Sequence, residues 1–422
     1  MEQTQDTSSS KAEADSDSDE GRSPLRSSLV QIILASTLLA PLGVPFLSPT
    51  LPVLRDVFLV SEAETSLLIS AYFVVGIAFS PFIGMVVDRL GRRPVLGGSL
   101  LIFGLSGGML FFAPSFLFIL GVRVIQGTAA AGLFITTVTL ISDSFDGVER
   151  NNVLGMNGAV LALGAAALPI LGGALIAFSW NTPFLAYLVA VPLGFIALKF
   201  IQEPDGVQQA NKISIRETIG ALSQRAMIVP YSASVVIEIL FFGAILTSLP
   251  FFLTNAYGVS TVIIGLVLSV TSISSVPFSI RNGYFTRYLS NSRLIALGFL
   301  LHGVGLVMTW LASSLLLTAL GAVIFGTGVG FSVPAIDSRI TNCVTKEHRG
   351  EALSIRNSAT FLGRTTGPLI FAAIAQVTGY PLLLLGAGFF SVALAVLITF
   401  LPSPKREESN RESVPGRVYC PG

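Results

Sequence analysis

The stretch GMVVDRLGRRP, residues 84–94, ends an apolar run that begins near residue 66. It places an aspartate, arginines and glycines directly after a segment that is suited to lipid. A sudden rise in charge at the end of a long apolar run is typical of a helix leaving a membrane, and basic residues there favour the cytoplasmic side. Retention of basic residues on the cytoplasmic side explains the arginines, but it explains neither the aspartate nor the glycines.

The composition of the whole chain indicates a membrane protein. Of its 422 residues, 52% are hydrophobic and 12% are charged, whereas soluble domains carry about 25% charged residues. Its mean hydropathy is +0.76. Runs of roughly 20 apolar residues recur, each long enough to cross a hydrocarbon core of about 30 Å. Because strands of a membrane barrel would be shorter and alternating, we predict twelve transmembrane helices: 28–50, 64–87, 95–113, 115–141, 152–178, 182–200, 227–254, 260–280, 294–312, 314–336, 352–377 and 380–401.

The charged residues gather on one side of the predicted membrane. Nearly all lie in the gaps after the even-numbered helices, whereas most gaps after odd-numbered helices are short and uncharged. Because Lys and Arg in short loops stay in the cytoplasm, both termini are expected there. The Ser-rich, acidic residues 1–26 have the composition of a disordered tail. We expect residues 403–422 to form a second cytoplasmic tail.

The sequence repeats itself at a spacing of 199 residues. The matching residues include Gly84 and Gly283, Arg150 and Arg349, and Pro169 and Pro368. We therefore predict an all-α membrane protein of two six-helix pseudo-repeat bundles, residues 27–201 and 227–402, joined by a cytoplasmic linker at 202–226. Internal repeats of this kind are typical of transporters, whose substrate site lies between the repeats near the middle of the bilayer.

The opening stretch resembles the loop signature of the major facilitator superfamily, which connects helices 2 and 3. The matching residues are Gly84, Asp88, Arg89, Gly91, Arg92 and Arg93. The resemblance implies that they form a gate or conformational switch, in which Asp88 helps to hold the outward-open state. Asp88 can accept hydrogen bonds from Arg92 or from a helix N-terminus. The alternative is that Asp88 lies in a solvated turn.

Two further stretches resemble signatures of the same superfamily. RVIQGTAAAG, residues 123–132, is similar to a motif of helix 4 through Arg123, Gln126 and Gly127. GAAALPILGG, residues 164–173, is similar to the helix-5 motif of the drug–proton antiporters. It keeps Gly164, Pro169, Gly172 and Gly173, but has Leu168 where that motif has glycine. The resemblance implies a twelve-helix fold over nearly the whole chain and a helix kink where the bundles meet.

Three charged residues lie deep in the predicted helices, namely Arg123, Glu238 and Arg364. A charge in hydrocarbon costs about 2.5–3.5 kcal/mol on insertion scales and marks a functional site by default. In the fold that the resemblance implies, their helices line or flank a central cavity. Arg123, Gln126, Glu238 and Arg364 are therefore candidates for the substrate cavity or for proton coupling. Glu238, the only deep acid, is the candidate proton carrier; alternatively, it forms a structural ion pair with Arg364.

Together these features favour a secondary active transporter that works by alternating access and exports hydrophobic or cationic small molecules in exchange for protons. A carrier of one specific metabolite is the alternative, and a non-transporting receptor is a remote one. We expect no enzyme, because the sequence contains no phosphate-binding loop, metal cluster or nucleophile constellation. We expect no cofactor, a proton or sodium gradient as energy source, and a monomer in the plasma membrane. Its partners would be a small-molecule substrate and lipid, without nucleic acid.

Overall fold

A computed structural model describes residues 27–203, 225–344 and 349–400. All regular structure within these ranges is helical. The predicted tails, 1–26 and 403–422, and most of the predicted linker, 202–226, lie outside the described residues.

The helices fall into two sets, one on each side of the linker. The first set comprises α2 (Ser28–Leu39), η2 (Ala40–Gly43), η3 (Ser48–Thr50), α3 (Leu51–Phe58), α4 (Glu62–Leu90), α5 (Arg92–Met109), η4 (Leu110–Phe112), α6 (Phe116–Ser144), α7 (Gly147–Leu175), η5 (Thr182–Val189) and α8 (Ala190–Phe200). The second comprises α10 (Arg225–Ile239), η6 (Leu240–Ser248), α11 (Leu249–Tyr257), α12 (Thr261–Ile280), α13 (Asn282–Phe285), α14 (Asn291–Leu311), α15 (Leu315–Asn342) and α16 (Arg349–Phe400).

Ten stretches of the described residues are long and apolar enough to cross a membrane. The last of them contains two helices, because the chain turns at Gly379, whose φ of 73° is a left-handed conformation that favours glycine. Helix α4, with 29 residues, is a further helix of spanning length. With α4 and the two arms of α16 counted separately, the described helices agree with the predicted number of twelve.

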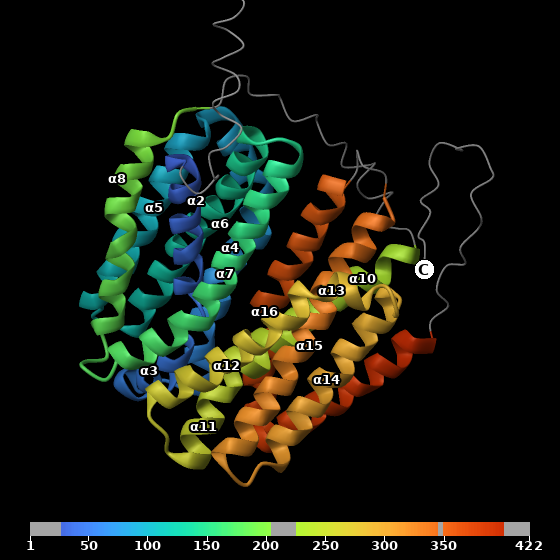
Figure 1. Cartoon of the computed structure of the whole chain (residues 1–422). Helices are drawn as coiled ribbons and strands as arrows, with labels where there is room; N and C mark the ends of the chain where they lie inside the picture. Colours follow the sequence, from blue (N-terminus) through green and yellow to red (C-terminus); the bar gives the residue numbers. More distant parts are fainter. Residues whose placement is uncertain (1–26, 204–224, 345–348, 401–422) are drawn as a thin grey trace, which may run out of the picture.

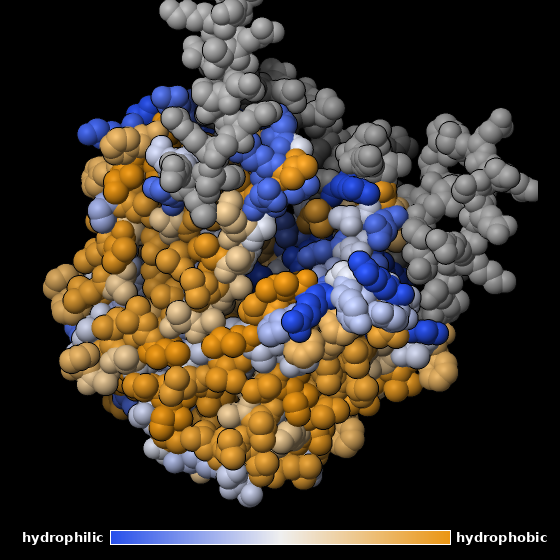
Figure 2. Space-filling view, in the orientation of Figure 1, coloured by the Kyte–Doolittle hydropathy of each residue, from blue (hydrophilic) through white to orange (hydrophobic). Residues whose placement is uncertain are grey.

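The two sets of helices form two bundles that lie side by side (Figure 1). The bundles meet at the end where α3 and α11 lie, and they spread apart toward the opposite end. In Figure 2 an apolar surface covers the flanks of both bundles, while hydrophilic residues gather at the spread end and in the hollow between the bundles. An apolar belt with polar residues beyond it suits a protein that crosses a bilayer.

The spacing of 199 residues is also a structural repeat. A Cβ on Gly127 of α6 would overlap the carbonyl oxygen of Tyr72 on α4, and Gly326 of α15 meets Thr271 of α12 in the same way. Other contacts repeat at this spacing: Ser115 and Ser314 as N-caps, Leu59 and Gly258 as left-handed C-caps, and the hydrogen bonds Arg150–Ser142 and Arg349–Thr341. The two bundles therefore share their packing and capping contacts.

The first helix of each bundle is irregular near its middle. In the first bundle the short 3-10 turns η2 and η3 interrupt the helix, in a segment whose prolines lack the backbone donor that an α-helix needs. At the corresponding place in the second bundle, η6 is a π-helix. The two segments touch, since the Ser48 hydroxyl donates to the carbonyl of Leu246. Interrupted helices at a repeat interface are typical of transporter substrate sites.

Arg123 donates a hydrogen bond to a backbone carbonyl that the break in the first helix leaves free. Its side chain is completely buried, and its guanidinium donates to the carbonyls of Gly43 and Leu68 and to the amide oxygen of Gln126. The same group lies 4.5 Å from the centre of the Tyr72 ring. A broken transmembrane helix is tolerated where neighbouring side chains bind its freed carbonyls. In this conformation Arg123 thus stabilises the interrupted first helix against α4 and α6.

We expect Arg123→Lys to lower the thermal stability of the protein. Lysine keeps the charge, but it lacks the planar fork that serves all three acceptors. Loss of buried hydrogen bonds to a charged group should cost about 2–3 kcal/mol, seen as a drop of several degrees in the apparent Tm in detergent. Arg150→Lys, at an exposed arginine that binds Ser142, is the control and should leave Tm unchanged. An unchanged Tm for Arg123→Lys would contradict the structural role.

Candidate functional site

The two bundles meet through backbone contacts between α7 and α12. A Cβ on Gly173 would overlap the carbonyl oxygen of Thr261, and a Cβ on Gly265 would overlap that of Pro169. The Thr261 hydroxyl also donates to the Gly173 carbonyl at 2.7 Å. Small residues allow transmembrane backbones to approach this closely. Any side chain at Gly173 or Gly265 would therefore push the bundles apart.

The predicted helix-5 motif lies at this junction. Helix α7 continues through Pro169 as a single helix, so the expected kink does not interrupt it. Gly164 and Gly172 face the first helix, where a Cβ would meet Pro41 and the carbonyl oxygen of Phe46, respectively. The glycines of the motif thus allow close packing on both sides of α7.

A polar cluster joins the bundles at the end where they meet. Glu62, at the start of α4, accepts hydrogen bonds from the Tyr380 hydroxyl and from the Asn255 amide, both in the second bundle. Arg55 of α3 pairs with the same carboxylate at 2.6 Å and lies 5.7 Å from the centre of the Phe251 ring. We call these five residues the Glu62 cluster. It must separate if the bundles are to open at this end.

We expect Tyr380→Phe to loosen this end without unfolding the protein. The substitution removes one donor to Glu62, a loss of about 1–2 kcal/mol. Backbone amides near residues 250–258 should then exchange hydrogen several-fold faster, as measured by mass spectrometry. Tyr187→Phe is the matched control, because the Tyr187 hydroxyl donates to the Leu42 carbonyl within the first bundle. Equal exchange in Tyr380→Phe and the wild type would contradict a closing role for the cluster.

Glu238 and Arg364 form a bidentate ion pair. Nε and Nη2 of Arg364 lie 3.1 and 3.2 Å from the two carboxylate oxygens of Glu238. Their helices approach closely because Gly363 lacks a side chain: a Cβ there would lie 2.7 Å from the Cβ of Glu238. The ion pair with Arg364, predicted from the sequence as the alternative role of Glu238, is therefore present.

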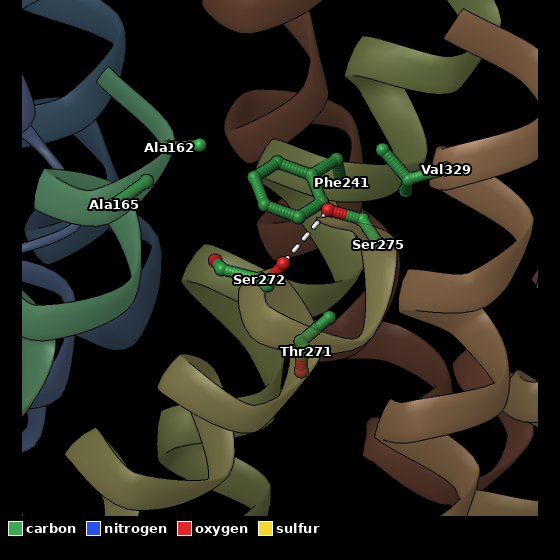
Figure 3. A pocket seen from close by; sticks show the side chains of 7 residues that line it. All are labelled: Ala162, Ala165, Phe241, Thr271, Ser272, Ser275 and Val329. Carbon is green, nitrogen blue, oxygen red and sulfur yellow. Dashed lines mark hydrogen bonds between the residues drawn. The ribbon is translucent and has the colours of Figure 1, made fainter. Parts of the chain in front are cut away.

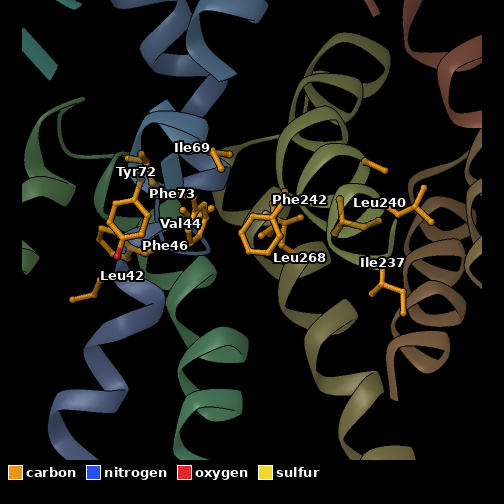
Figure 4. Packing of buried hydrophobic residues seen from close by; sticks show 14 of the residues in the cluster. Leu42, Val44, Phe46, Ile69, Tyr72, Phe73, Ile237, Leu240, Phe242 and Leu268 are labelled. Atoms are coloured by element: carbon orange, nitrogen blue, oxygen red, sulfur yellow. The ribbon is translucent and has the colours of Figure 1, made fainter. Parts of the chain in front are cut away.

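Three phenylalanine rings surround the guanidinium of Arg364. Its central carbon lies 5.2 Å from the ring centre of Phe242, 5.6 Å from that of Phe73 and 5.9 Å from that of Phe361. Phe73 belongs to the first bundle and packs edge-on against Phe242 of the second at 5.1 Å between centres (Figure 4). We call these three rings the phenylalanine cage. The ion pair thus lies at the junction of the bundles.

A cavity of about 130 Å³ lies between the bundles. The side chains that line it come from both sides (Figure 3): Ala162 and Ala165 of α7, Phe241 of η6, Thr271, Ser272 and Ser275 of α12, and Val329 of α15. The Ser275 hydroxyl donates to the carbonyl of Ser272. The lining therefore combines apolar surface with a few hydroxyl groups and carries no charge, which suits a largely apolar ligand.

The Gly-Arg-Arg sequence of the opening stretch is held within the first bundle. Gly91 has a φ of 93°, and a Cβ there would lie 2.6 Å from the carboxylate of Glu203. That carboxylate accepts hydrogen bonds from the backbone amides of Arg92 and Arg93, at the start of α5. An anion at a helix N-terminus is stabilised by the unpaired amides and the helix dipole. The left-handed φ favours glycine at this position, and the absence of a Cβ leaves room for the Glu203 carboxylate.

The two arginine side chains bind partners of the first bundle. Arg92 Nε donates to Asp143 of α6 at 2.9 Å, and Arg93 Nε donates to the carbonyl of Leu198 at 2.6 Å. Arg89 is exposed. Gly84 and Asp88 belong to α4, but their surroundings lie outside the described side chains, so the role of Asp88 remains a prediction.

The structure brings together only some of the residues that the sequence singled out. Glu238 and Arg364 meet at the bundle junction, whereas Arg123 and Gln126 are completely buried inside the first bundle, where they bind each other. Sequence reasoning missed Glu203 and Tyr380. Glu203 follows α8 and Tyr380 begins the last arm of α16, and no local pattern shows that they bind residues more than 100 positions away.

Comparison with known proteins agrees with this geometry. A sequence model of the Major Facilitator Superfamily matches residues 33–251 and 231–418. The chain is 28% identical to the bacillibactin exporter of Bacillus subtilis over 391 residues, covering 89% of this chain and 96% of that protein. It is also 28% identical to the class E tetracycline resistance protein of Escherichia coli over 415 residues, covering 92% and 99%.

Solved structures share the fold. A bacterial homologue of the human lysosomal transporter Spinster, in an inward-facing and occupied conformation, superposes with a TM-score of 0.76 at 16% identity, covering 90% of this chain and 97% of that one. Two bundles joined at one end, with a cavity between them and an ion pair of the second bundle at their junction, agree with the transporter fold of these relatives. The chain belongs to the Major Facilitator Superfamily and is a multi-pass membrane protein.

Proposed function

We propose that this transporter exports hydrophobic or cationic small molecules in exchange for protons by alternating access. The observation that carries the proposal is the position of Glu238, a carboxylate near the middle of the seventh span, at the junction of the bundles. A proton carrier must face each side of the membrane in turn, and a group between two bundles that rock against each other can do so. A proton or sodium gradient supplies the energy, and no cofactor takes part.

The relatives support export as the direction of transport. One of them is named a bacillibactin exporter and another a tetracycline resistance protein, and each matches this chain over most of its length. The cavity lining, apolar with a few hydroxyls, favours hydrophobic substrates over sugars. The transporter binds a small molecule and lipid, catalyses no covalent reaction and binds no nucleic acid. We propose that it works as a monomer in the plasma membrane.

The charge pattern supports an orientation for the proposed cycle. Basic loops such as the one at Arg89–Arg93 stand at the spread end of the bundles, so that end faces the cytoplasm together with both termini. The Glu62 cluster then closes the outer face. Opening to the outside requires this cluster and the α7–α12 contact to separate while the cytoplasmic ends come together. Asp88 would hold that outward-open state.

The test is transport by purified protein in proteoliposomes. Efflux of the fluorescent cation ethidium is followed under an imposed pH gradient, with a sodium gradient and no gradient as the alternatives. Flux that needs the pH gradient and stops when a protonophore collapses it is the expected result. Flux driven by sodium alone would contradict proton coupling, and the absence of flux with correctly inserted protein would contradict export of such cations.

A specific metabolite carrier is the second candidate. The similarity to a protein that is named for the export of one compound, bacillibactin, favours it. Competition experiments distinguish the two candidates, because a carrier of one metabolite should be inhibited by that compound class and not by unrelated hydrophobic cations.

A further inference from the structure

The guanidinium of Arg364 lies among groups that are typical of a cation-binding site, namely a carboxylate and aromatic rings. The carboxylate of Glu238 binds it at 3.1 and 3.2 Å, and the phenylalanine cage surrounds it at 5.2–5.9 Å from the ring centres. The faces of aromatic rings attract cations, and aromatic cages with a desolvated interior bind quaternary ammonium groups. The chain thus fills a cation site with one of its own side chains.

Of the two residues of the ion pair, Arg364 is the one whose charged group can move out of the site. Its side chain is 30% exposed, against 13% for Glu238, which packs against Gly363. An arginine side chain is long and has several rotatable bonds, so its head can move toward water while its stem stays packed. If Arg364 left and nothing replaced it, Glu238 would be an unpaired and largely buried charge, which is strongly unfavourable. Another cation in the cage would avoid that penalty.

The cage adjoins the cavity between the bundles. Phe241 lines that cavity, and its ring centre lies 5.6 Å from that of Phe242 in the cage. A ligand with its charge in the cage can therefore extend an apolar part past these two rings. The alanines and the valine of the cavity lining would receive that part.

We propose that Arg364 is a tethered substitute for the substrate: a hydrophobic cation binds Glu238 and the phenylalanine cage by displacing the Arg364 guanidinium, with its apolar part in the cavity. The inference rests on the proposed function, because it specifies where an exported cation binds. In the absence of substrate Arg364 keeps Glu238 paired, and it competes with the substrate for the same carboxylate.

The test is equilibrium binding of tetraphenylphosphonium to the purified full-length protein in detergent, without any gradient. Arg364→Ala removes the competitor and should tighten binding about tenfold, whereas Phe242→Leu and Phe361→Leu remove cage rings and should weaken it about five- to tenfold. Arg364→Gln is a second variant in case the alanine protein fails to fold, and binding should tighten in it as well. Phe278→Leu is the control, since its ring packs with Phe285 and Phe331 away from the cage.

Two results would overturn the inference. One is unchanged or weaker cation binding in both Arg364 variants, together with unchanged binding in the cage variants. The other is binding of the lipophilic anion tetraphenylborate to the wild type but not to the Arg364 variants, which would make Arg364 an anion site. Cation binding as expected without gradient-driven flux in proteoliposomes would contradict the proposed function alone.

Discussion

Glu238→Gln is expected to abolish transport driven by a pH gradient, lowering the initial rate of ethidium efflux by at least about a hundredfold. Glutamine keeps the size of the side chain and can still accept a hydrogen bond from Arg364, but it cannot take up or release a proton. The rate is measured in proteoliposomes against wild-type protein at equal density. Retention of an unchanged rate would rule Glu238 out as the proton carrier.

Two variants control for effects of the substitution itself. Glu64→Gln makes the same chemical change at an exposed acid of the capping box that starts α4, a position where glutamine is equally suitable. Its transport rate should equal that of the wild type. Glu238→Asp keeps a titratable group and should retain part of the rate. A loss in Glu238→Asp as complete as that in Glu238→Gln would indicate that the ion-pair geometry matters more than the proton.

The helices and the repeat could be predicted because both depend on local properties of the sequence. A span needs enough consecutive apolar residues, and the contacts of Gly127 and Gly326 recur because the same glycines recur at a constant spacing. The pairing of Glu238 with Arg364 could also be anticipated. Charges in hydrocarbon need partners, and the candidates were few.

The remaining features depend on contacts between distant segments. Pro41, Pro45, Pro49 and Pro52 indicate a bend toward the outer end of the first helix. They do not show that Arg123 binds the freed carbonyl of Gly43. No proline or glycine pattern predicts the π-helix η6. The phenylalanine cage combines rings from α4, η6 and α16, and this chain has 30 phenylalanines, so packing alone selects these three.

Gly173→Ala is expected to shift the transporter toward the conformation that is open at the Glu62 cluster. The added Cβ would overlap the carbonyl oxygen of Thr261 in the other bundle, and separation of the bundles at that end would relieve this overlap. Overpacking of this kind costs about 1–3 kcal/mol, which changes a two-state population roughly five- to 150-fold. Within each bundle the substitution removes no contact. The fold should therefore remain while the conformational equilibrium moves.

Hydrogen exchange followed by mass spectrometry separates this effect from simple destabilisation. In Gly173→Ala, amides near residues 255–265 should exchange faster, while those near residues 89–93 should exchange more slowly as the opposite ends come together. Gly172→Ala is the matched control, because its Cβ would overlap the Phe46 carbonyl inside the first bundle. It should lower the apparent Tm without the reciprocal pattern. If Gly173→Ala also showed only a lower Tm, the α7–α12 contact would be part of a fixed interface, and the bundles would have to open elsewhere.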